Sequence, residues 1–219
     1  MFAWLSDGTP SGAMPGFRTV LDAQQRWDFI NLLRAFADGH RARVLAADIE
    51  AYRPWLAAPN FQFQSADGTS GELRDLRTES SVLLVFAGSS AARAQMLDLA
   101  TQASTLPGIG LRVLFVPLAE SCANLSIAQA ALTCISTGGT VAATAYALLS
   151  RTLAHAGRRE ELVPMLQDAA FLIDRFGYLR ARWLPGDELA PWSAQQLRRM
   201  QQALADEPQI RAAPELHVH

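Results

Sequence analysis

The sequence contains no lysine, so all 19 of its basic residues are arginine. The basic residues are nearly balanced by 21 acidic ones, and the formal net charge is -2. A protein that binds nucleic acid needs a strongly basic surface, and this composition does not provide one. We therefore expect no nucleic-acid partner, and we interpret the missing lysine as codon bias.

Long apolar runs are also absent. No segment has the roughly 20 consecutive apolar residues that a membrane-spanning helix needs. Met1–Leu5 lacks the charged and apolar regions of a signal peptide. The sequence thus predicts no membrane span and, taken alone, no export, while a hydrophobic content of 50% is enough for a globular core.

Cysteine is scarce, since Cys122 and Cys134 are the only two. Their spacing fits neither a CxxC redox pair, nor a zinc site, nor the CxxCH motif that attaches a c-type haem. A disulfide between them is open on this evidence. Because cysteine is among the most often buried residue types, we favour two buried, unpaired thiols.

The N-terminal part of the chain predicts loop and helix. Glycine and proline predict a loop over 1–20. A helix is expected to begin at Asp22, which forms a capping-box pattern with Gln25, and to end at Gly39. Its apolar residues recur at helical spacing: Phe29, Leu32, Leu33 and Phe36. A weaker helix is expected over 41–48.

From residue 59 onward, strand and helix patterns alternate. Apolar, β-branched runs predict buried strands at Ser81–Ala87 and Leu111–Leu118. Shorter strands are expected at 61–64, 133–136, 171–174 and 178–183. Helices are expected at 90–104, 124–131, 140–153 and 193–205. This alternation predicts an α/β fold with helices on both faces of a central sheet.

Three stretches resemble thioredoxin-like domains: Ala58-Pro59-Asn60-Phe61, VLLVFAGSSAARAQM at 82–96, and FLIDRFGYLRARW at 171–183. The last closely resembles the periplasmic end of bacterial fusion proteins related to copper resistance protein D. The resemblance implies a thioredoxin-like sandwich, with a central mixed sheet between helices, after an N-terminal helical appendage. It places this domain at 59–207, after a linker at 51–58 and before a flexible tail at 208–219.

Residues 1–50 resemble part of a class I c-type cytochrome, through the loop SGAMPGF at 11–17 and the helix that follows it. In that family the methionine of such a loop is the axial haem ligand. The resemblance implies this role for Met14 only if an upstream segment supplies CxxCH, and it leads us to expect a fragment of a longer gene product. For the chain as given, we favour packing of Met14 against the following helix.

The resemblance fails at the thioredoxin-like active site. When the chain is aligned on Arg93, Ser89-Ser90-Ala91-Ala92 stands where the redox enzymes carry CxxC, and serine cannot supply a thiolate or form a disulfide. Asp168 stands where those enzymes have a cis-proline. The two cysteines and the histidine of Sco-type copper chaperones have no counterpart set in this chain.

The resulting expectation is that the chain is not an enzyme. We expect a redox-inactive accessory module for copper handling or electron transfer, periplasmic by resemblance. Its expected partner is a membrane copper-transport or cytochrome segment of the same system, and no resident cofactor is expected in this chain.

Two other functions are kept as alternatives. One is a haem-binding module completed by a missing segment. The other is a serine hydrolase, because Gly88-Ser89-Ser90-Ala91-Ala92 resembles a nucleophile elbow. Ser90 would then be the nucleophile, with Asp168 or Asp174 as the acid and His217 as the base. A serine that simply caps the next helix, or an anion bound at that helix terminus, would explain the same residues.

The C-terminal tail carries the one metal site that we predict. His217 and His219 are one residue apart, so their side chains share one side of an extended tail, and imidazole is a good Cu(II) ligand. We predict weak Cu(II) binding that disappears when residues 215–219 are removed, and below about pH 6, where imidazoles protonate. A titration of the full and truncated chains, followed by the visible copper band, tests this. Equal uptake by both would contradict it.

Overall fold

The computed structural model describes residues 1–45, 49, 56–78, 80–103, 110–118, 122, 132–150, 166–185 and 193–207. The chain divides into two compact units, unit 1 at Met1–Ala42 and unit 2 at Arg43–His219. The helix predicted at 124–131 and the tail predicted at 208–219 lie outside the described residues.

Unit 1 begins with a helix that the sequence did not predict. The expected loop over 1–20 contains α1 (Phe2–Asp7), which ends at Gly8 with a φ of 86°. The Ser6 hydroxyl donates to the Phe2 carbonyl at 2.8 Å and accepts a hydrogen bond from the Arg26 guanidinium at 2.6 Å. The hydrogen bond between Ser6 and Arg26 joins α1 to the residues of the next helix, beyond the glycine- and proline-rich sequence that follows α1.

The second helix, α2 (Ala23–Val44), begins as predicted. The Gln25 amide N–H donates to the Asp22 carboxylate at 2.8 Å, and the Asp22 amide N–H donates to the Gln25 side chain at 3.0 Å, which is a capping box. The helix does not end at Gly39 but continues to Val44, so residues 41–44 of the predicted separate helix at 41–48 belong to α2, and residues 46–48 lie outside the described residues. A glycine in a helix interior lowers helix stability by only about 1 kcal/mol relative to alanine, so α2 can continue through Gly39.

Unit 2 is built on an eight-stranded mixed sheet in the order β1-β8-β7-β4-β5-β6-β2-β3. The strands are β1 (Leu56–Ala57), β2 (Gln62–Ser65), β3 (Ser70–Glu72), β4 (Ser81–Ala87), β5 (Leu111–Pro117), β6 (Leu132–Thr137), β7 (Ala169–Ile173) and β8 (Tyr178–Trp183). Strands β4, β5 and β6 are parallel, and the other pairings are antiparallel.

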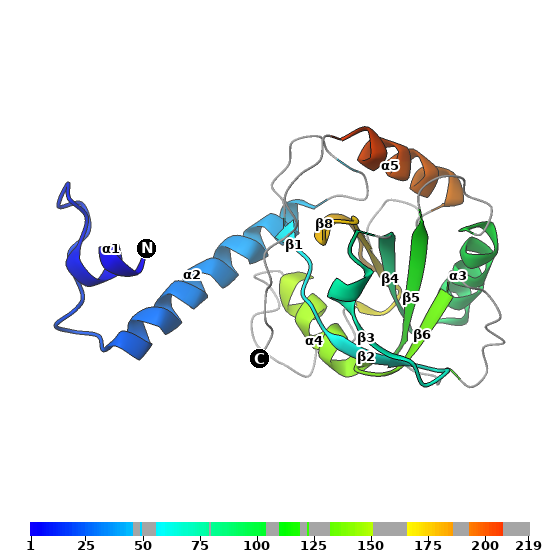
Figure 1. The fold of residues 1–219 in the computed structure, drawn as a ribbon, viewed down its shortest axis with the longest axis horizontal. Helices are drawn as coiled ribbons and strands as arrows, with labels where there is room; N and C mark the ends of the chain where they lie inside the picture. The colour runs from blue at the N-terminus through cyan, green and yellow to red at the C-terminus, as the bar shows by residue number, and fades with distance from the viewer. Residues whose placement is uncertain are drawn as a thin grey trace. The chain divides into compact units, whose positions relative to one another are not determined.

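Helices cover both faces of this sheet (Figure 1). They are α3 (Ser90–Ala103), α4 (Gly139–Ser150) and α5 (Ala194–Asp206), and a short 3-10 helix η1 (Leu73–Leu76) follows β3. This arrangement confirms the predicted α/β sandwich with an N-terminal helical appendage. Leu56 and Ala57, which the sequence predicted as part of a linker at 51–58, form β1 and pair with β8, and residues 51–55 lie outside the described residues.

Strand β4 lies at the centre of the core, with all seven of its residues buried. Successive side chains of β4 point to opposite faces of the sheet. On one face, Leu83 and Val85 join a cluster that contains Met96 of α3 and Met200 of α5. On the other face, Phe86 packs on Tyr146 of α4 and Phe171 of β7, with ring centroids 5.7 and 6.0 Å apart.

The expectation of two unpaired thiols is wrong, because Cys122 and Cys134 form a disulfide. Cys134 lies on β6, and Cys122 lies in the connection that leaves β5; both belong to the cluster on the α3 face. Their Cα atoms are 5.9 Å apart, within the range that a disulfide spans. Sequence spacing could not show this, because the two residues meet only when β5 and β6 pair in parallel.

Candidate functional site

Residues Ser89–Ala92, which the resemblance aligns with the CxxC motif of redox enzymes, lie where β4 ends and α3 begins. In this turn the backbone N–H groups of Gly88 and Ser89 both donate to one carboxylate oxygen of Asp168, each at 2.9 Å. Asp168 directly precedes β7, whose first residue Ala169 pairs with Phe86. The structure therefore brings Ser89 and Asp168 together, although they are 79 residues apart in the sequence.

Ser89 also caps α3. Its hydroxyl accepts a hydrogen bond from the Ala92 amide at 3.2 Å, and its carbonyl accepts one from the Arg93 amide at the same distance. This is the N-cap role that a serine commonly plays. Ser90 and Ala91 are exposed in the first turn of α3, and Ala92 is buried in the core cluster.

The backbone of Asp168 is unusual, with a φ of 64° in the left-handed region. Aspartate tolerates this region better than most residues do, and here two hydrogen bonds hold its carboxylate in place. None of the peptide bonds among the described residues is cis. A Cβ on Gly88 would lie 2.6 Å from Cγ of Gln167, so the exposed Gln167 side chain would have to move for any larger residue.

These contacts determine what the turn can do chemically. A helix N-terminus attracts anions through its free N–H groups, and in redox enzymes it favours the thiolate form of a cysteine. Here the carboxylate of Asp168 occupies the amides of Gly88 and Ser89, and the hydroxyl of Ser89 occupies that of Ala92. The carboxylate of Asp168 therefore accepts hydrogen bonds that an external anion at this turn would need. This argues against an external anion site there.

Asp174, the other acid considered for a hydrolase triad, lies at the opposite end of β7. The register pairs Phe86 with Ala169 near Ser90, but Val82 with Ile173 beside Asp174. At about 3.3 Å per residue, the length of the strand separates Asp174 from Ser90. Among the described residues, Asp174 and Ser90 are thus not brought together, and His217 lies outside the described residues.

Asp174 instead belongs to a buried ionic network. Its carboxylate accepts hydrogen bonds from the amides of Phe176 and Tyr178 and lies 3.2 Å from the guanidinium of Arg180. Arg180 also makes a two-pronged contact with Glu207, at 2.6 and 2.7 Å. The network fixes the turn between β7 and β8 and holds the end of α5 against β8.

Burial raises the pKa of Asp174, although the two amides and Arg180 favour its charged form. Burial by itself would lower the pKa of Arg180, but its hydrogen bonds to Glu207 and the charge of Asp174 outweigh that and raise it. These opposing effects are typical of an ion pair that supports structure, and nothing in them requires a catalytic role.

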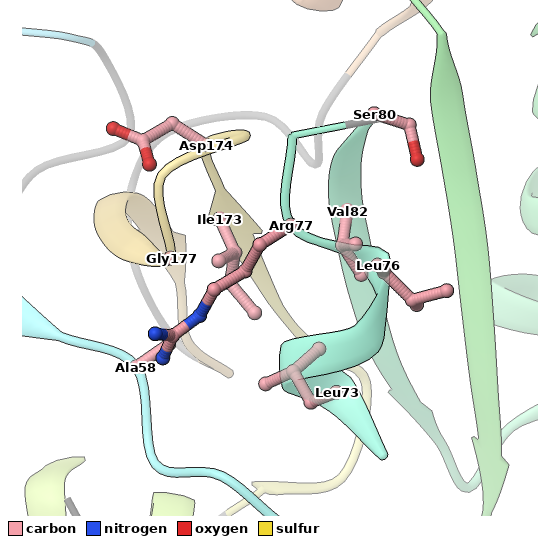
Figure 2. Close-up of a pocket in the computed structure, with 9 residues that line it drawn as sticks. All are labelled: Ala58, Leu73, Leu76, Arg77, Ser80, Val82, Ile173, Asp174 and Gly177. Carbon is pink, nitrogen blue, oxygen red and sulfur yellow. The ribbon is translucent and has the colours of Figure 1, made fainter. Parts of the chain in front are cut away.

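A small cavity of about 10 Å³ lies beside this turn (Figure 2). It is lined in part by Ser80, whose buried hydroxyl has no hydrogen-bond partner among the described residues. Figure 2 shows the guanidinium of Arg77 next to Ala58 and Gly177, and a Cβ on Gly177 would lie 2.5 Å from Nε of Arg77. The cavity has room for about one water molecule, so it is too small for a substrate.

The remaining predicted site residues lie in unit 1 or outside the described residues. Met14 lies in unit 1, where its amide donates to the Thr9 hydroxyl at 3.0 Å and its side chain is half-buried. His217 and His219 lie outside the described residues. Within the described part of the chain, no group of three or more potential ligands is arranged to hold a metal. No helix described there is long and apolar enough to cross a membrane.

No protein-family model matches the chain, and no curated protein matches it. Among solved structures, unit 2 is similar to BsSco, a member of the Sco family of cytochrome c oxidase assembly proteins. The TM-score is 0.52 and the identity 16%, over 73% of this chain and 99% of that one.

Two further solved structures are similar at lower scores. A thioredoxin-family thiol:disulfide interchange protein from Chlorobium tepidum TLS has a TM-score of 0.49 and 16% identity, over 70% of this chain and 99% of that chain. Yeast Sco1 with copper bound has a TM-score of 0.47 and 14% identity, over 71% and 96%. The fold of unit 2 is thioredoxin-like; at these identities the likeness shows the fold alone.

We predict that Asp168 stabilises unit 2 through its two amide contacts. Asp168→Ala and Asp168→Gly should each lower the free energy of unfolding by about 1–3 kcal/mol, because two partly buried donors lose their acceptor. Asp168→Asn keeps an acceptor oxygen and should cost less. Urea unfolding measures all three.

The glycine variant is the control for backbone strain, since glycine adopts a positive φ freely. If Asp168→Gly were as stable as the wild type, the carboxylate contacts would contribute nothing and the prediction would fail.

Proposed function

We propose that this chain is a redox-inactive, thioredoxin-like accessory module of a periplasmic copper-handling or electron-transfer system. The observation that carries the proposal is the pair of hydrogen bonds from Gly88 and Ser89 to Asp168. They put a fixed carboxylate at the place where a thioredoxin-like enzyme needs a reactive thiolate.

Catalysis of thiol–disulfide exchange requires an accessible thiolate with a lowered pKa. At the turn after β4, serine replaces cysteine, and the neighbouring negative charge of Asp168 would disfavour a second anion. The sulfurs of Cys122 and Cys134 are bonded to each other and belong to residues that are only 8% and 2% exposed. Neither position offers the thiolate that the reaction needs.

The disulfide supports the periplasmic part of the proposal. Disulfides persist in oxidising compartments such as the bacterial periplasm and are rare in the cytosol. The copper and electron-transfer part rests on the resemblance of FLIDRFGYLRARW at 171–183 to copper resistance protein D fusions. The assignment of BsSco to a family of cytochrome c oxidase assembly proteins agrees with it.

A module of this kind acts by binding rather than by bond exchange. We propose that it docks on a membrane copper-transport or cytochrome segment of the same system. In this proposal, the exposed residues Ser90 and Ala91 lie where thioredoxin-like enzymes contact their substrates, but no residue of this turn reacts with a substrate.

Insulin reduction by dithiothreitol tests the proposal, with an active thioredoxin as the positive control. We predict that the chain gives no turnover above the dithiothreitol background. A Cys122→Ser/Cys134→Ser variant at the same concentration is the matched control. Turnover by the wild type that this variant lacks would overturn the proposal.

A further inference from the structure

The β6-β2-β3 end of the sheet joins β5 through fewer residue pairs than β5 shares with β4. Strands β2 and β3 form a hairpin that reaches the sheet only through β6 in the strand order. Strand β6 pairs with β5 at three residue pairs, whereas β5 pairs with β4 at seven. We call β6, β2 and β3 the sheet edge, and β5, β4, β7 and β8 the sheet body.

The disulfide lies at the join between these two parts. Cys134 forms the last of the three pairs between β6 and β5, opposite Phe115. Its carbonyl also accepts a hydrogen bond at 2.9 Å from the amide of Ala66, in the turn between β2 and β3. Cys122 follows β5, so the sulfur–sulfur bond ties the connection that leaves the body directly to the strand that carries the edge.

The opposite face of the edge has its own attachment. Phe61, just before β2, packs on Tyr146 of α4 with ring centroids 6.3 Å apart. Within the edge, the hydroxyl of Ser136 on β6 donates to the carbonyls of Gln64 and Ser65 on β2, at 3.0 and 3.1 Å. The contact of Phe61 with Tyr146 does not involve sulfur, so loss of the disulfide would weaken the attachment of the edge without removing every contact that holds it.

The sheet body is held by other contacts. Strands β4 and β7 share five residue pairs, and the end of α5 is fixed to β8 by Arg180 and Glu207. Proteins open locally in cooperative units that follow such differences in attachment. The body and the edge are therefore separate candidates for local opening.

We propose that the Cys122–Cys134 disulfide is a redox-sensitive link that holds the β6-β2-β3 edge to the sheet body. While it is oxidised, the edge is locked to the body. When it is reduced, the edge opens locally while the body stays folded. The proposal does not depend on the absence of catalysis at Ser89, because it concerns a change in the state of the chain and not turnover.

The reductant is a dithiol. One of its thiolates attacks the sulfur of Cys122, the more exposed residue of the pair, and forms a mixed disulfide as Cys134 leaves as a thiolate. The second thiolate of the reductant then displaces Cys122. The reductant is oxidised to a disulfide, and the chain gains two electrons and two protons.

Hydrogen exchange measured by mass spectrometry on the full chain tests the proposal. The chain is compared in its oxidised form, after dithiothreitol under native conditions, and as Cys122→Ser/Cys134→Ser. We expect exchange at 62–72 and 132–137 to rise on the order of 100-fold, the effect of losing a disulfide that closes a loop of this size. Exchange at 81–87 and 169–183 should change less than about 3-fold.

Met96→Ala is the control for general destabilisation. Met96 is fully buried on α3 and shares the core cluster with Leu83 and Val85 of β4. Its substitution should accelerate exchange across β4 and β5 and not selectively at the edge.

Three results would overturn the proposal. The first is unchanged exchange at the edge after reduction. The second is an equal acceleration of hydrogen exchange in the edge and in the body, including complete unfolding of the reduced chain or of the double serine variant. This result would mean that the disulfide stabilises the whole domain. The third is an intact mass that does not gain two hydrogens in native dithiothreitol.

Discussion

All seven residues of β4 are buried, so both edges and both faces of this strand must be covered by other parts of the chain. Strands β5 and β7 cover its edges, α3 and α5 cover one face, and α4 covers the other. Because β7 runs antiparallel to β4, the residue before β7 necessarily lies where β4 ends. The position of Asp168 beside Ser89 follows from this packing.

This juxtaposition puts a carboxylate beside the turn between β4 and α3, where it accepts hydrogen bonds from the amides of Gly88 and Ser89. In redox enzymes, a helix N-terminus favours the thiolate form of a cysteine. The sulfur atoms of this chain's two cysteines lie elsewhere, in a buried disulfide between β6 and the connection after β5.

The sequence predicted those features that local pattern determines. The apolar run Ser81–Ala87 predicted a strand buried on both faces, and the capping-box residues before α2 predicted where that helix begins. It missed α1, whose Ser6 accepts a hydrogen bond from Arg26, and the disulfide, which joins Cys134 on β6 to Cys122 in the connection after β5. The position of Asp168 was inferred from resemblance, but its amide contacts required the structure.

The central claim is that Asp168 holds the anion position at the start of α3. The pKa of a cysteine introduced as Ser89→Cys, followed by the ultraviolet absorbance of the thiolate, tests it directly. With Asp168 present, the account predicts a thiol pKa at or above the ordinary value of about 8.5. With Asp168→Asn added, the pKa should fall by about one unit or more. A pKa that is already well below the ordinary value beside Asp168, or that the second substitution leaves unchanged, would contradict the account.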